Sequence, residues 1–237
     1  QWLGKAVQIL ERIPLQKGRY ARLEEVYYFL GFNLWELGKK KDSVGYFEKI
    51  VREFPKGRFA AEAYRYIADH AFAARDFRKS RSFYQSAARF ESSPARPRVL
   101  YGLAWSHFKL RDYKRAISTM ADAIRLGRAA TEKGGLALQR DAADSLALFY
   151  SEGGRVDQAS EYFSELFEPV EAASVLRKLA NIYQRSGKYA NALAINKQLM
   201  AMGGAAAREG DEQRYEIMVD GLRVATTKGD REREAAL

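Results

Sequence analysis

Few residues in this sequence could perform acid–base or metal chemistry. The chain has 237 residues, no cysteine and two histidines, His70 and His107. A chain without cysteine has no thiolate nucleophile, no disulfide framework and no Cys-type zinc site. Asp141 and Asp144 stand one helical turn apart, a spacing that could serve a cation or a proton but is common on solvated helix faces. Phosphate-binding loops, His-Glu-x-x-His and serine-elbow motifs do not occur. We therefore expect no catalytic residue, no metal and no cofactor.

The charge of the chain is concentrated in its N-terminal part. The sequence holds 40 Lys and Arg against 30 Asp and Glu, a net charge of +10. Residues 1–150 carry 28 basic and 16 acidic side chains, whereas residues 151–237 carry 12 and 14. Such a basic excess favours an acidic protein, an anionic lipid or a nucleic acid as a partner, and it does not decide the fold. No apolar run approaches 18 residues, so we expect no membrane-spanning helix.

A helix–turn–helix pattern recurs five times along the chain. In each copy about fourteen residues of helical periodicity precede a short polar turn, and about twelve more follow it. The turns and the first residues after them occupy 38–43, 75–80, 111–116, 154–159 and 187–192. A helical pair that recurs at a regular spacing along the sequence predicts an all-α array in which each unit packs against its neighbours.

The copies resemble the tetratricopeptide repeat (TPR) family, whose unit has about 34 residues with fixed bulky and small positions. In the copy that begins at Glu24, those positions hold Tyr27, Leu30, Gly31, Leu34, Ser43, Phe47, Ile50 and Pro55. Where the two helices of a unit cross, only Gly, Ala or Ser lets the backbones approach closely, and a generic bundle would place Leu at several of these positions. The crossing pairs here are Gly31/Ser43, Ala68/Ser80, Ala104/Ala116, Ala147/Ala159 and Ala180/Ala192. The resemblance implies an all-α, right-handed superhelical solenoid.

The spacing of the copies divides the chain into two blocks. The copies begin at residues 24, 61, 97, 140 and 173, so the third step, of 43 residues, is the longest. Glycines weaken a helix between Leu126 and Gly135 and favour an irregular joint there. We expect an N-terminal block at 1–128, with a partial repeat and three basic repeats. The C-terminal block at 129–237 holds two repeats and a truncated terminal repeat.

Two segments and two residues depart from the regular unit. Trp2–Ile13 resembles the second helix of a preceding repeat, and Tyr215–Lys228 resembles a first helix. His107 occupies a core position that usually holds Tyr, which favours a packed histidine over a general base. Asn196 stands where an apolar residue is expected, so the fifth copy either packs less well there or contacts something polar.

The junction between the first two copies resembles a narrower group. Glu53–Ala63, with Phe-Pro followed by a polar turn and an Ala-rich helix, is similar to linkers of bacterial cell-envelope TPR proteins. These include outer-membrane assembly lipoproteins and Tol-Pal coordinators. The resemblance implies a scaffold in the periplasm or cell envelope rather than the cytoplasm.

The TPR resemblance also implies a binding surface. Repeat positions 2, 5, 9, 12 and 13 of each first helix line the concave face in this family. In the first three copies they supply aromatic residues, which with Arg are enriched at binding hot spots. We expect an aromatic groove with basic borders, and the alternative is that the same side chains pack between repeats as core. The predicted groove residues are Tyr28, Phe32, Trp35, Arg65, Phe72, Arg98, Tyr101, Trp105, Phe108 and Lys109.

Two further surfaces have more than one interpretation. Arg177 and Asn181 resemble the pair with which some TPR modules bind a C-terminal carboxylate, but Asp220 stands where the next Asn would be needed, which favours a solvated face. A basic ridge is formed by the turn segments Lys39–Lys41, Arg75–Arg81 and Arg111–Arg115. It could meet acidic protein, lipid headgroups or nucleic acid, or could only confer solubility. Nucleic acid is disfavoured because aromatic residues for base stacking are not interleaved with these cations.

The sequence therefore predicts a non-catalytic scaffold that binds a peptide or helix of a protein partner, favouring an acidic one. Two alternatives remain at this point. The chain could self-associate into homo-oligomers, or it could be the regulatory TPR region of a larger enzyme or nucleic-acid-binding protein.

Overall fold

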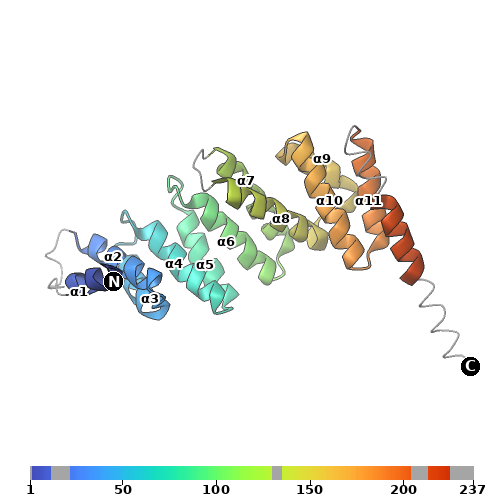
Figure 1. Cartoon of the computed structure of the whole chain (residues 1–237). Helices are drawn as coiled ribbons and strands as arrows, with labels where there is room; N and C mark the ends of the chain where they lie inside the picture. The colour runs from blue at the N-terminus through green and yellow to red at the C-terminus, as the bar shows by residue number, and fades with distance from the viewer. Residues whose placement is uncertain (1, 12–21, 130–134, 204–212, 225–237) are drawn as a thin grey trace, which may run out of the picture. The chain divides into compact units, whose positions relative to one another are not determined.

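The computed structural model describes residues 2–11, 22–129, 135–203 and 213–224, and these residues are helices joined by short turns (Figure 1). Within this described part no strand occurs, as expected for an all-α repeat array. A further helix spans residues 213–224. The other helices are α1 (Trp2–Glu11), α2 (Leu23–Glu36), α3 (Lys40–Glu53), α4 (Ala60–Ala73), α5 (Phe77–Ala88), α6 (Arg96–Lys109), α7 (Tyr113–Ala129), α8 (Gly135–Gly153), the 3₁₀ turn η1 (Val156–Gln158), α9 (Ala159–Leu166), α10 (Pro169–Arg185) and α11 (Tyr189–Ala201).

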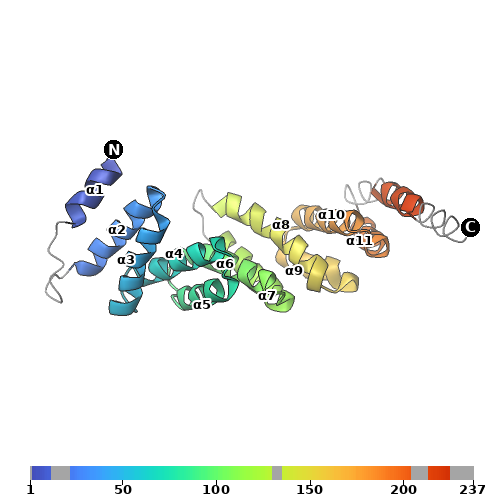
Figure 2. The same cartoon turned by 90° about the horizontal axis from the view of Figure 1, so that it is seen from below.

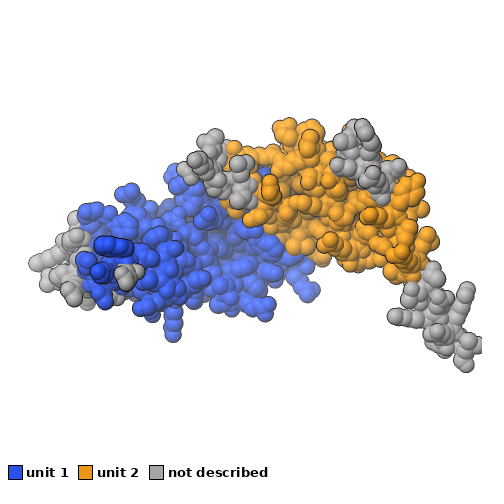
Figure 3. All heavy atoms as spheres, in the orientation of Figure 1, with its two compact units in different colours: residues 1–126 blue, residues 127–237 orange. Residues whose placement is uncertain are grey.

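The chain forms two compact units, residues 1–126 and residues 127–237 (Figure 3). Parts of the predicted joint (130–134) and of the predicted terminal repeat (225–237) lie outside the described residues. Each repeat has a first helix, which is α2, α4, α6, α8 or α10. The second helix is α3, α5, α7, α9 or α11 (Figure 2).

Small residues at the helix crossings let these pairs pack closely. Gly31 is buried, and a Cβ atom there would lie 2.9 Å from the Phe47 ring. The Ser43 hydroxyl donates a hydrogen bond of 2.7 Å to the Gly31 carbonyl. The other eight crossing residues, among them Ala104 and Ala180, are fully buried. The sequence prediction of close crossings is thus confirmed in all five repeats.

The core of unit 1 is shared between successive repeats. Its main cluster includes Tyr27 of α2, Phe47 of α3 and Tyr66 of α4, and the Phe47 and Tyr66 rings stack with centroids 4.5 Å apart. Burying one such side chain stabilises the fold by about 2 kcal/mol. A second cluster joins Val7 of α1 to Leu30 and its neighbours on α2. Each repeat therefore depends on the next for part of its core.

The described core of unit 2 includes buried polar side chains, among them Asn196. The Tyr150 ring of α8 contacts the Phe163 ring of α9 at 5.0 Å, and α10 packs against both α9 and α11. The Gln198 side chain accepts a hydrogen bond of 2.8 Å from the Ser160 amide and donates one of 2.6 Å to the Val156 carbonyl, which holds the irregular start of α9. Asn196 is fully buried, and its amide makes no hydrogen bond with the described residues.

Four of the five turns between first and second helices share one backbone feature, and the turn at Gly154 does not. Gly38, Arg75, Arg111 and Gly187 occupy the same repeat position, and all four have positive φ, at 77°, 62°, 62° and 72°. Two of the four are arginine, although glycine adopts this left-handed conformation most readily.

Candidate interaction surfaces

The predicted aromatic residues of α2 lie half-buried and link this helix to the next repeat. The Tyr28 ring stacks on Phe59 with centroids 4.3 Å apart and an interplanar angle of 16°. Trp35 meets Tyr66 edge-on at 4.9 Å, and the Lys40 amino group lies 5.0 Å from the Trp35 ring. Burial raises the pKa of the Tyr28 hydroxyl to about 12. These side chains therefore have a packing role and also keep a partly exposed edge.

Arg65 lies in a buried ion-pair network rather than at an open surface. Its Nε donates to Glu62 Oε2 at 2.8 Å and its Nη1 to Asp69 Oδ2 at 2.7 Å, while the Tyr84 hydroxyl donates to the other oxygen of Asp69. Burial would lower the pKa of the Arg65 guanidinium, but Asp69 and Glu62 hold it above its ordinary value. Burial raises the pKa of the Asp69 carboxyl, and Arg65 and Tyr84 oppose that rise. Arg65 is thus neutralised within its own repeat.

The third repeat carries a separate aromatic group on α6. Trp105 meets Phe108 edge-on at 5.7 Å, and Phe108 lies 5.5 Å from the Tyr113 ring of α7. The Lys109 amino group lies 5.3 Å from the Trp105 ring. Tyr101 is half-buried.

The remaining predicted residues lie on α4 and α6. Phe72 is half-buried and packs on Phe77 at 5.2 Å, whereas Arg98 is exposed and contributes positive potential at Asp69. The ten predicted residues thus share the first helices of unit 1 but form local groups rather than one continuous stack.

The sequence did not point to Phe59 and Tyr66, whose rings contact those of Tyr28 and Trp35, respectively. Phe59 lies directly before α4. It is the one apolar residue at the end of the polar junction that follows Pro55, and this pattern is the signal by which the sequence could have identified it. Its amide donates a hydrogen bond of 2.7 Å to Glu24 Oε1, so the junction is fixed to the start of α2.

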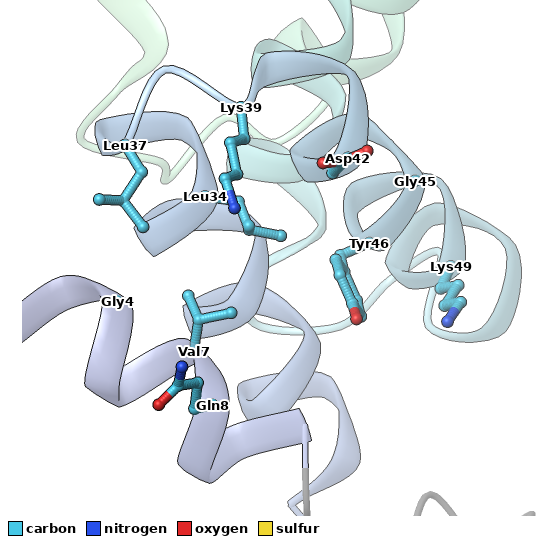
Figure 4. Close-up of a pocket in the computed structure, with 10 residues that line it drawn as sticks. All are labelled: Gly4, Val7, Gln8, Leu34, Leu37, Lys39, Asp42, Gly45, Tyr46 and Lys49. Carbon is cyan, nitrogen blue, oxygen red and sulfur yellow. The ribbon is translucent and has the colours of Figure 1, made fainter.

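Two of the cavities among the described residues of unit 1 have a known lining, and none of the ten predicted residues belongs to it. One, of about 630 Å³, lies among α1, α2 and α3, with Val7, Leu34 and Tyr46 as apolar lining and Lys39 and Lys49 beside them (Figure 4). The other, of about 370 Å³, lies next to the α3–α4 junction and the end of α5. Both are open depressions between helices.

The basic ridge is exposed in all three of its turns. Lys39–Lys41, Arg75, Arg78, Arg111 and Lys114 are exposed. Asp76 caps α5 by accepting a 3.0 Å hydrogen bond from the Lys79 amide, and Asp112 pairs with Arg115 at 3.1 Å. Ten basic and two acidic residues make up the ridge segments.

Two comparisons bear on the fold. Residues 30–97 and 68–131 match the family model for the tetratricopeptide repeat. The structure superimposes on a tetratricopeptide repeat protein from Parabacteroides merdae with a TM-score of 0.55 at 14% identity, covering 94% of this chain and 86% of that one. This is the TPR fold.

Other solved structures are similar to the same degree. YrrB, described as a TPR protein with an unusual peptide-binding site, gives a TM-score of 0.54 at 14% identity and covers 90% of this chain and 98% of its own. BtubC (BKLC) from P. vanneervenii gives 0.54 at 16% identity, covering 88% and 90%. At these identities the likeness concerns the fold alone. No curated protein sequence matches the chain.

The other residues singled out from the sequence have local structural partners. His107 is buried, and its Nδ1 lies 3.6 Å from Asp112 Oδ2. Asp144 pairs with Lys178, and Asn181 accepts a hydrogen bond from Gln213, so the TPR carboxylate-clamp position is engaged within the chain. Among the described residues no acidic or histidine cluster suits a metal ion, and no helix is long and apolar enough to cross a membrane.

Proposed function

We propose that unit 1 binds a peptide or helix of a protein partner along the first helices α2, α4 and α6. The observation that carries the proposal is the concentration of half-buried aromatic side chains on these helices. At repeat position 9, unit 1 has Phe32, Asp69 and Trp105, whereas unit 2 has Leu148 and Asn181. Partly exposed aromatics next to cations are typical of binding hot spots. The resemblance to YrrB, whose description includes a peptide-binding site, supports the same class of function.

The proposal includes the character of the partner and its setting. Unit 1 holds 25 basic and 13 acidic residues, which favours an acidic partner over a basic one. The similarity of Glu53–Ala63 to junctions of cell-envelope TPR proteins supports an assembly in a bacterial cell envelope. The role is that of a non-catalytic scaffold.

The test uses matched substitutions at one repeat position. Trp105→Ala removes a proposed contact in unit 1, and Leu148→Ala removes a half-buried side chain at the equivalent place in unit 2. In pull-downs from cells that express the native protein, we expect Trp105→Ala to lose a specific partner more than tenfold, the size of one hot spot, and Leu148→Ala to retain it.

Folding must be measured on the same samples. If Trp105→Ala lowers the melting temperature so far that the domain is unfolded in the assay, Trp105→Phe replaces it, because it keeps an aromatic ring in the core. Unchanged partner capture by folded variants at Trp35 and Trp105 would contradict the proposal, and those side chains would then be core.

Self-association is a second candidate, favoured by one observation. The helix at residues 213–224 exposes Tyr215, Met218, Val219 and Leu222, which are spaced as one helical face. Light scattering at increasing protein concentration tests this alternative. A monomer at all concentrations would contradict it.

A further inference from the structure

Two consecutive repeats of unit 1 place an arginine where the backbone favours glycine. Arg75 and Arg111 both have φ of 62°, and the equivalent residues Gly38 and Gly187 have φ of 77° and 72°. A left-handed conformation is unfavourable for a residue with a Cβ atom, because that atom approaches the following carbonyl. Residues held in such conformations cluster at functional sites.

The left-handed residue lets the backbone cap the preceding helix, since the Asp76 amide donates to the Ala71 carbonyl at 2.9 Å and the Asp112 amide to the His107 carbonyl at 3.0 Å, but these bonds do not need an arginine side chain. Arg75 and Arg111 are exposed and form no ion pair or ring contact with the described residues. Each follows the C-terminus of a first helix and precedes the N-terminus of a second helix, so the opposing ends of two helix dipoles meet there and largely cancel. The arginine side chains are therefore directed to solvent without a structural partner.

A second position in the same turns is basic in every repeat of unit 1. Lys41, Arg78 and Lys114 are equivalent, exposed, and placed in the first turn of α3, α5 and α7. The equivalent residues of unit 2 are Asp157 and Ala190. The fold thus accepts acidic, neutral or basic residues at this position, and unit 1 has only basic ones.

These turns lie along one edge of unit 1. In a stack of antiparallel helix pairs, every turn from a first to a second helix falls on the same side. Arg81 of α5 and Arg115 of α7 both act electrostatically on buried His107, so the second and third turns are neighbours. Packed helices lie about 10 Å apart, which sets the approximate spacing of the cationic turns.

We propose that the basic ridge of unit 1 is a docking surface for an extended acidic protein segment. A chain in the extended polyproline II conformation advances about 3.1 Å per residue with three residues per turn, so an acidic residue at every third position stays on one face and meets each turn in succession. Asp42, Asp76 and Asp112 stand between the cations. A peptide can place neutral residues beside these carboxylates, whereas a phosphate polymer brings closely spaced charge against them. The inference is independent of the proposed aromatic groove.

The test is a binding measurement with a defined probe. A labelled peptide of about twelve residues, with glutamate at every third position and Ser and Gly elsewhere, is titrated with the whole chain and followed by fluorescence anisotropy. We expect binding that weakens about tenfold when salt rises from about 0.05 M to 0.2 M, because exposed ion pairs are screened. A peptide of the same composition with its glutamates clustered at one end should bind more weakly.

Substitutions to glycine separate binding from folding. Arg75→Gly/Arg111→Gly should weaken the peptide about tenfold, since two exposed ion pairs are lost. The same variant should melt about 6 °C higher, because glycine adopts the positive φ without strain at both positions. The matched control, Lys56→Ser/Arg89→Ser, removes two exposed cations from the opposite edge and should change affinity less than twofold.

Three results would overturn the proposal. One is a lower melting temperature for the glycine variant, which would show that the arginines serve the fold. Another is an equal loss of peptide affinity in the Lys56→Ser/Arg89→Ser control, which would show that the net charge of the chain, and not the position of the arginines, determines binding. The third is tighter binding of single-stranded DNA or of phosphatidylserine vesicles than of the spaced peptide, which would assign the ridge to phosphates.

Discussion

Three turns of unit 1 and the Gly187 turn of unit 2 have the same left-handed backbone and different side chains. At the left-handed position unit 2 has Gly187 with φ of 72°, whereas unit 1 has Gly38 with φ of 77° and Arg75 and Arg111 with φ of 62°. Residues 1–126 hold 25 basic and 13 acidic residues, and residues 127–237 hold 15 and 17. Because unit 2 builds the same turn without these cations, the fold does not require them. The difference indicates that the surface of unit 1 is specialised.

The first helices differ in the same direction. Unit 1 presents half-buried Trp35, Trp105 and Phe108, while the equivalent surface of unit 2 has no aromatic residue and holds Leu148 with polar residues such as Gln184 and Asn181. Both units nevertheless keep the same buried crossings of small residues. Conserved packing combined with a different surface is the pattern expected when one unit binds and the other supports.

The largest effect should come from enlarging one crossing in each unit. Ala104→Leu and Ala180→Leu each place three extra carbons at a fully buried site, which should lower the free energy of unfolding by about 3 kcal/mol. All three tryptophans, Trp2, Trp35 and Trp105, lie in unit 1. Urea unfolding followed by tryptophan fluorescence therefore monitors unit 1, and circular dichroism monitors the whole chain.

The two variants should differ between these probes. Ala104→Leu should shift the fluorescence midpoint, whereas Ala180→Leu should shift mainly the circular dichroism transition, because repeats contact only their neighbours. If both variants shift the urea midpoints of both probes by the same amount, the two units unfold together, and their stabilities cannot be compared separately.

The crossings show what sequence alone could predict about the fold. Gly, Ala and Ser at paired positions predict that two helices approach closely there, and in the structure every pair is buried. Helix order follows from the same repeat positions. The irregular start of α9 was not predictable, because it depends on Gln198 from the following repeat. Contacts between repeats are not encoded in the consensus of one repeat.

The surface was less predictable for the same reason. Position in the repeat placed Arg65 beside the aromatic groove, but its charge is satisfied by Glu62 and Asp69 on the same helix. Trp35 and Tyr28 were assigned to the surface, and their degree of burial depends on Tyr66 and Phe59 of the next repeat. Repeat position predicts which helix face a side chain occupies. It does not predict what the neighbouring repeat brings against that face.

An intermediate effect is expected at the core position where unit 1 has His107 and unit 2 has Tyr183. Burial lowers the pKa of His107 below its ordinary value of 6.5; Asp112 opposes that shift, and Arg81 and Arg115 add to it. The unfolded chain therefore takes up a proton at higher pH than the folded chain. Stability should be fully present above about pH 7 and should fall as pH drops through 6.5.

His107→Tyr should remove this pH dependence. The buried Nδ1 atom, which makes no hydrogen bond, disappears, so the variant should also be more stable by about 1–2 kcal/mol at pH 6. The measurement is the urea midpoint at pH 5.5 and pH 7.5 for both proteins. A pH slope that persists in the variant would assign the dependence to other groups.

The smallest effect tests the turn comparison directly, by giving unit 2 the arginine of unit 1. A Cβ atom at Gly187 would meet nothing within 4 Å, so Gly187→Arg places a side chain on an already left-handed backbone without a steric clash. It should lower the free energy of unfolding by about 1 kcal/mol, the conformational cost alone. The matched control is Ala190→Arg, which adds the same charge at an exposed helical position of α11 and should be close to neutral. The free energy of unfolding of both variants is measured by urea titration.

If Gly187→Arg lowers the free energy of unfolding no more than Ala190→Arg does, an arginine at this turn is free of strain, and Arg75 and Arg111 need no function to explain them. If only Gly187→Arg is destabilising, unit 1 carries that cost in two consecutive repeats, and a surface role for Arg75 and Arg111 is the remaining explanation.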